Sequence, residues 1–208
     1  PEWVRFWTIQ FAADEAAAWP TELRESIAGQ LDHLTPLIER SLASTCQHRI
    51  RLGFAEDVQP ILAQLLQQPS HEQPSEHAQQ DDYEHANEKL LATLKWYAVE
   101  PLVVSQTAWV LRQLASIKSP LVQRLIARRM VALDDGLARL TRTWNTDQQG
   151  DWIAASLAGV LEATQGLQSL PAPENWNDIY ARLQQNFNAE VRELSRQLST
   201  LFGDTQAL

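Results

Sequence analysis

Apolar side chains recur along most of the chain at spacings of three and four residues, the period of an amphipathic helix. From Thr21 to Leu34, for example, four aliphatic residues share one helical face. The same period predicts a succession of helices over residues 2–13, 21–34, from Pro36 onward, around 58–66, and over 83–99, 105–117, 120–132, 134–144, 151–167, 176–186 and 190–202. Leu and Ala far outnumber Val and Ile, whose branched side chains lose freedom in a helix, so the sequence predicts an all-α protein.

Two of these helix starts have similar sequences. TPLIERSLAS at 35–44 and SPLVQRLIAR at 119–128 both place Thr or Ser, the usual N-cap, before a proline at the first helical position. The offset of 84 residues corresponds to two units of 42. Fainter copies around Val4 and Val191, and a further start near Ile153, extend the repeat. Self-similarity at this period predicts a HEAT-like or armadillo-like α-α superhelix of about five to six helix pairs, forming one domain over 1–208.

Three features interrupt the repeat. Residues 67–82 (QQPSHEQPSEHAQQDD) contain almost no apolar side chain, which predicts a flexible solvated loop. Pro101 is expected to end or kink the helix before it. The last predicted helix has no partner after it and the chain begins at Pro1 rather than Met, so we expect the segment to continue in a longer protein.

The amino-acid composition agrees with a helical chain and limits the classes of partner that it can bind. There are only 7 glycines, where about 15 would be average. The net charge of −9 opposes generic binding to nucleic acid or to anionic membranes, and no apolar run reaches the roughly 18 residues that cross a bilayer. The single cysteine, Cys46, can form neither an internal disulfide nor a Cys-x-x-Cys-His haem attachment site, and we expect it to be a small buried residue.

Three segments of the sequence follow the pattern of one protein family: WYAVEPLV at 96–103, IKSPLVQRLIARRM at 117–130 and VRELSRQLSTLFGD at 191–204. They resemble the HEAT-like repeat region of the large multidomain haem-binding, membrane-bound-dehydrogenase-like proteins of planctomycetes and related bacteria. In that family the helical region lies between a sugar-dehydrogenase-like β-propeller and a C-terminal c-type cytochrome domain. The polar loop at 67–82 departs from the family pattern.

The resemblance implies where the segment acts. It implies an exported, periplasmic or membrane-associated protein, in which the partners of this segment are the propeller-like and haem domains of the same chain. No haem motif or propeller strand is present in the segment. The resemblance therefore carries over no catalytic residue and no cofactor, and implies a non-catalytic spacer or docking scaffold.

The densest basic cluster offers one candidate site. Arg124 and Arg128 are four residues apart and share a helical face, with Arg129 beside them and Glu100 upstream. These residues could line an anion-binding groove, or bind one repeat to the next as an ion-pair ladder. We favour the ladder, because planar guanidinium groups commonly link neighbouring elements in this way.

Aromatic and titratable residues offer weaker candidates. Trp96, Tyr97 and Trp109 could form a hydrophobic docking surface, although packing between helix layers is the more common role of such residues. The set His71, His77 and His85 has spacings of 6 and 8, which match no compact metal-ligand motif. The serines Ser105 and Ser119 have no nearby His and Asp partners in sequence.

Three functions from different classes fit these patterns. The first is the spacer and docking scaffold of an exported redox protein. The second is a stand-alone helical-repeat adaptor that binds a protein or peptide in its concave groove. The third is an enzyme on a helical-repeat scaffold, such as a DNA-base glycosylase, which the acidic net charge disfavours.

Overall fold

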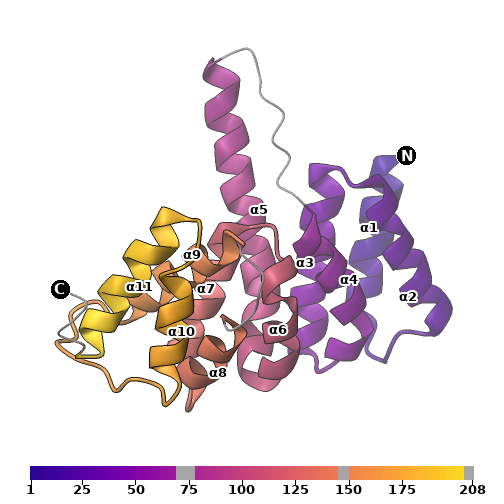
Figure 1. The fold of residues 1–208 in the computed structure, drawn as a ribbon. Coiled ribbons are helices and arrows are strands. Elements are labelled where there is room, and N and C mark those ends of the chain that lie inside the picture. The colour runs from indigo at the N-terminus through magenta and orange to yellow at the C-terminus, as the bar shows by residue number, and fades with distance from the viewer. Residues whose placement is uncertain (69–77, 145–149, 204–208) are drawn as a thin grey trace. The chain divides into compact units, whose positions relative to one another are not determined.

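The computed structural model describes residues 1–68, 78–144 and 150–203, and the elements that it describes are all helical (Figure 1). Eleven α-helices and two short 3-10 helices account for these elements: α1 Glu2–Ala13, α2 Thr21–Ala28, η1 Gly29–His33, α3 Pro36–Arg51, α4 Ala55–Gln67, α5 Ala78–Ser105, α6 Thr107–Gln113, η2 Leu114–Ser116, α7 Pro120–Val131, α8 Gly136–Thr143, α9 Trp152–Ala163, α10 Trp176–Leu183 and α11 Ala189–Leu201. The all-α prediction is confirmed for this part of the chain.

The chain forms two compact units. The first unit comprises Pro1–Ser105 together with Ser116–Ser119, and the second comprises Gln106–Ala115 together with Pro120–Leu208. Each unit is described separately below.

The predicted helix starts at the repeated phrase are correct. In α3 the hydroxyl of Thr35 accepts a hydrogen bond from the backbone N–H of Ile38, at 3.4 Å, and Pro36 is the first helical residue. The helix α7 likewise begins at a proline, Pro120. Proline is tolerated at this position because its missing N–H would have no partner within the helix.

Several predicted boundaries are wrong. The helix predicted over 21–34 divides into α2 and the 3-10 helix η1, and the N-cap of α2 is Pro20. Pro101 does not end α5, which continues to Ser105. The burial of Leu102 and Val103, neither of which is exposed at all, explains why this last turn stays helical despite the hydrogen bond that proline removes.

The helix α5 also begins earlier than predicted. It starts at Ala78, so residues 78–82 of the predicted loop are helical. Residues 69–77 of the predicted loop lie outside the described part of the chain.

The first unit is built around α3. This helix packs against α1, α4 and α5, while α2 packs against α4 and η1. Ile38, Leu42 and Cys46 lie on one face of α3 and are fully buried. Burial raises the pKa of the Cys46 thiol to about 12, because a thiolate would lose its hydration there. The thiol is therefore neutral at physiological pH and serves as a packing group.

A buried arginine holds the segment between α1 and α2 against α3. Arg49 donates hydrogen bonds to the carbonyl oxygens of Glu15 and Ala17 and forms an ion pair with Asp57 of α4 at 2.6 Å. The side chain of Arg49 is not exposed at all, and that of Asp57 is 6% exposed. The Arg49 guanidinium also lies over the ring of Trp19, at 5.0 Å from its centre.

Trp19 completes this network. Its backbone N–H donates to Asp57 Oδ2 at 2.9 Å, and its indole N–H donates to the carbonyl oxygen of Ala12 at 2.8 Å. The carboxylate of Asp57 thus joins α4 to both α3 and the α1–α2 connection. Charge-assisted hydrogen bonds of this kind offset the cost of removing both ions from water.

A second buried ion pair joins α3 to α5. Lys95 Nζ lies 2.6 Å from Glu39 Oε1, with side-chain exposures of 5% and 2%. Separating the pair would leave a buried charge without its counter-ion, so the pair opposes displacement of α5 from α3.

The second unit is built around the contact of α7 with α9. The helix α7 also contacts α8, α9 contacts α11, and α11 contacts α10. The approach of α9 to α7 is close at Gly159, where an added Cβ would overlap the backbone carbonyl of Arg124. A glycine at this point allows the two helix backbones to come nearer than any side chain would.

Four aliphatic residues occupy corresponding points of the repeated phrase and its fainter copies, namely Val4, Ile38, Val122 and Val191, and their burial differs. The repeat itself stays a prediction. Ile38, Val122 and Val191 are all completely buried in their helices. Val4, which we placed in the same position, is instead 60% exposed. The apolar residues of α1 lie on more than one face, so the sequence pattern could not show which face is buried.

Candidate functional site

The residues of the predicted ion-pair ladder lie in different units. Glu100 is half-buried on α5 of the first unit, whereas Arg124, Arg128 and Arg129 lie on α7 of the second. Within the second unit, Arg124 Nη1 is 3.3 Å from Glu162 Oε1 of α9. This ion pair links two neighbouring helices, as a ladder residue would. The pairing of the arginines with Glu100 stays a prediction.

The predicted docking aromatics also lie in different units. Trp96 and Tyr97 are on α5, and Trp109 is on α6. Trp96 and Trp109 are half-buried, while Tyr97 is 49% exposed. Neither a docking role nor a packing role is tested by these positions, and both stay predictions.

The remaining candidates contribute little to a site. His71 and His77 lie outside the described residues, as does the side chain of His85. Within the described part of the chain, no three His, Cys, Asp or Glu side chains gather as metal ligands. The Ser105 hydroxyl donates a hydrogen bond to the carbonyl oxygen of Pro101, and Ser119 is buried before α7.

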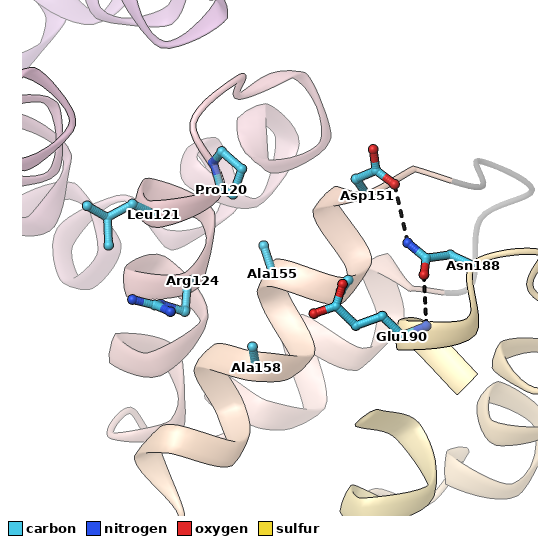
Figure 2. Close-up of a pocket in the computed structure, with 9 residues that line it drawn as sticks. Pro120, Leu121, Arg124, Asp151, Ala155, Ala158, Asn188 and Glu190 are labelled. Carbon is cyan, nitrogen blue, oxygen red and sulfur yellow. Dashed lines mark hydrogen bonds between the residues drawn. The ribbon is translucent and has the colours of Figure 1, made fainter. Parts of the chain in front are cut away.

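The second unit contains a groove that the sequence did not reveal. It has a volume of about 350 Å³ and lies among α7, α9 and the start of α11 (Figure 2). Its floor is made of small side chains of α9, namely Ala154, Ala155 and Ala158. Pro120, Leu121 and Arg124 of α7 form one wall, and Asp151, Asn188 and Glu190 form the other.

The acidic wall is held in place by Asn188. Its side-chain amide donates to Asp151 Oδ1 at 3.3 Å, and its side-chain oxygen caps α11 by accepting from the backbone N–H of Glu190 at 2.8 Å. Figure 2 shows both hydrogen bonds, with the Glu190 carboxylate directed over the alanines of α9. Asn188 therefore holds the Asp151 carboxylate directly and fixes the backbone of the first residues of α11, from which Glu190 extends.

The charges of the groove are unequal on its two sides. Arg124 is 42% exposed but already paired with Glu162, so its charge is partly neutralised. Asp151 and Glu190 are both exposed. The groove thus combines an apolar floor with an acidic rim, which suits a segment that carries small apolar side chains and a basic residue.

The sequence contained only weak signals for this groove. Asn188 and Glu190 fit a helix cap, and the alanines of α9 lie on one side of a helix that also carries Gly159. Asp151 and Asn188 are 37 residues apart, however, and nothing in their spacing indicates that they meet.

The described fold defines the class of this chain, an all-α helical protein. Comparisons with protein-family models, with curated proteins and with solved structures find no match to it. In the part of the chain that the structure describes, no helix is both long enough and apolar enough to cross a membrane.

Proposed function

We propose that this chain is a non-catalytic scaffold, a HEAT-like α-α superhelix that acts as a spacer within an exported multidomain redox protein. By the resemblance described above, its neighbours are a propeller-like oxidising domain and a haem domain. Its mechanism is geometric, because a stiff stack of helices holds two domains at a set separation.

The observation that carries the proposal is the set of helix–helix contacts within each unit. In the first unit α3 contacts both α1 and α5, and in the second α9 contacts both α7 and α11. Alternate helices therefore lie side by side. Stacked helix pairs of an α-solenoid make the same nearest-neighbour contacts. The equivalent burial of Ile38, Val122 and Val191 in α3, α7 and α11 supports the same arrangement.

The placement of charged groups gives further support. Arg49 with Asp57, and Lys95 with Glu39, are buried between helices of the first unit. Each pair tolerates little displacement, since separating buried partners leaves a charge without compensation. Such cross-links stiffen a scaffold against relative motion of its helices.

A second candidate function is a stand-alone adaptor that binds a peptide. The observation that favours it is the groove of the second unit, with its alanine floor and the carboxylates of Asp151 and Glu190. In this case the ligand would come from another molecule.

A selection from a random peptide display library separates the two functions. An intrachain spacer is expected to enrich no peptide that depends on the groove. An adaptor would enrich sequences with a shared basic residue, and the variant Asp151→Asn/Glu190→Gln would weaken their binding by about tenfold or more, as expected for two lost charge contacts.

The matched control is Glu193→Gln, an exposed acid of α11 outside the groove. It removes a negative charge without changing the groove. Enriched peptides that respond to the groove variant and not to this control would contradict the spacer proposal.

A further inference from the structure

The outer face of α1 carries a stripe of exposed aromatic side chains. Trp3, Trp7 and Phe11 follow one another at intervals of four residues and are 63%, 52% and 71% exposed. The Trp7 and Phe11 rings are stacked at 5.8 Å, and Phe6 packs against both Trp3 and Trp7. Val4, 60% exposed, lies beside this aromatic stripe. A contiguous exposed apolar patch of this kind marks an interaction surface more often than a scattered residue does.

The opposite face of α1 packs against the rest of the first unit. Ile9, Ala12 and Ala13 are buried, and α1 packs against α3. The Arg5 side chain donates to both the side chain and the backbone carbonyl of Gln30, at 2.6 and 3.0 Å. Gln10 donates to the Ser41 hydroxyl of α3 at 2.7 Å. The helix is therefore anchored on one side, which leaves the aromatic stripe free to bind on the other.

We propose that the aromatic stripe docks a single amphipathic α-helix with an aliphatic face and basic residues at its ends. The stripe extends from Trp3 to Phe11 along one helix, a length of about 12 Å, so its partner must be similarly narrow. The contact of α1 with α3 shows the mode that would be repeated, in which one helix lies along the next. A docked helix would lie along α1 as α1 lies along α3, which would add a third helix to the same layer.

Charge at the two ends of α1 defines the partner further. Glu2 is exposed at the start of the helix, and Asp14 and Glu15 are exposed at its end. The Glu2 carboxylate also accepts a hydrogen bond from Thr35, and Asp14 Oδ1 lies 3.6 Å from His48 Nε2; both neighbours leave the carboxylates exposed and negatively charged. The only basic residue of α1, Arg5, is occupied by Gln30. A partner helix with lysine or arginine at its ends would therefore find acidic groups at both ends of the stripe.

The exposed area argues against a second copy of this chain as the occupant. Three aromatic side chains of about 150–250 Å² each, a little more than half exposed, offer on the order of 400 Å². A stable protein interface buries about 800 Å² on each partner. The stripe alone is half that size, which suits one docked helix.

Two acetylated and amidated 18-residue peptides test the proposal. The first has leucines at i, i+3, i+4 and i+7, glutamines on its other face and lysines only at its ends; the second has the same composition with the leucines distributed around the helix. At 0.15 M salt we expect the first peptide to bind, measured by fluorescence anisotropy. The variant Trp7→Gln/Phe11→Gln should weaken this binding by at least about tenfold.

The matched control is Phe187→Gln, which removes an aromatic side chain that is 86% exposed in the second unit. It should bind the first peptide as the unchanged protein does. Circular dichroism establishes that each variant is folded. Binding supports the proposal only if it depends on the leucine face and on the stripe.

Four results would overturn the proposal: no binding, equal binding of both peptides, equal binding by the stripe variant, or the same loss in Phe187→Gln. Sedimentation of the protein alone provides another test, since a dimer that Trp7→Gln/Phe11→Gln dissociates would assign the stripe to a second copy. Binding to phosphatidylcholine vesicles that the same variant abolishes would assign it to a membrane surface. The proposal uses only the first unit, so its failure would leave the scaffold proposal unchanged.

Discussion

Replacement of Arg49 by methionine is expected to lower the free energy of unfolding by about 3 to 5 kcal/mol. The substitution leaves the Asp57 carboxylate buried without its counter-ion, and it removes the hydrogen bonds to the carbonyl oxygens of Glu15 and Ala17. Methionine has a similar length, so the lost charge rather than a large cavity dominates the effect. Urea denaturation followed by circular dichroism measures the change.

The matched control is Arg196→Met, which breaks the exposed ion pair with Glu193 on α11. Side chains that are about half exposed contribute little, and we expect a loss below about 1 kcal/mol. The double variant Arg49→Met/Asp57→Asn should recover part of the stability, because the buried charge is gone. Equal losses for Arg49→Met and Arg196→Met would show that the buried network is not a stabilising element.

Substitution of Gly159 by alanine is expected to destabilise the protein by about 2 to 3 kcal/mol, although alanine favours a helix by about 1 kcal/mol. The new Cβ would overlap the backbone carbonyl of Arg124 and lie 3.1 Å from the Cβ of Ala127. Backbone atoms cannot rotate away as a side chain can, so α7 and α9 must separate. Thermal and urea denaturation would both report the loss.

Gly29→Ala is the matched control for this substitution. Gly29 has a right-handed backbone conformation, with φ of −61°, and an added Cβ would meet no atom within 4 Å. We expect this variant to be neutral or slightly stabilised, because alanine restricts the unfolded chain. A Gly159→Ala protein as stable as Gly29→Ala would refute the close contact of α7 with α9.

The sequence predicts helices well where local signals are strong. Thr35 and Pro36 define the start of α3 because capping and the geometry of proline are local effects. Pro101 does not end α5, because the packing of Leu102 and Val103 outweighs the hydrogen bond that proline removes. The exposed stripe of α1 was missed for a related reason. Large apolar residues lie on more than one of its faces, and only contact with α3 decides which face is buried.

The groove and the buried Arg49 network both depend on contacts between residues that are far apart in the sequence. Asp151 and Asn188 come from the connections before α9 and α11, and Arg49 of α3 meets Asp57 of α4 and Trp19 of the α1–α2 connection. Charged residues are usually expected at the surface, so the burial of Arg49 could not be predicted from its own neighbourhood. The family resemblance suggests a context for the chain, but it indicates neither the groove nor the aromatic stripe.

The most direct test of the central proposal is to sequence the complete open reading frame that encodes this segment and to measure the mass of the native protein. A spacer within an exported redox protein predicts β-propeller sequence on the N-terminal side and a Cys-x-x-Cys-His haem attachment motif on the C-terminal side. The native mass should then match a chain that contains all three parts. A frame that encodes neither neighbouring domain would contradict the spacer and leave the adaptor as the better account.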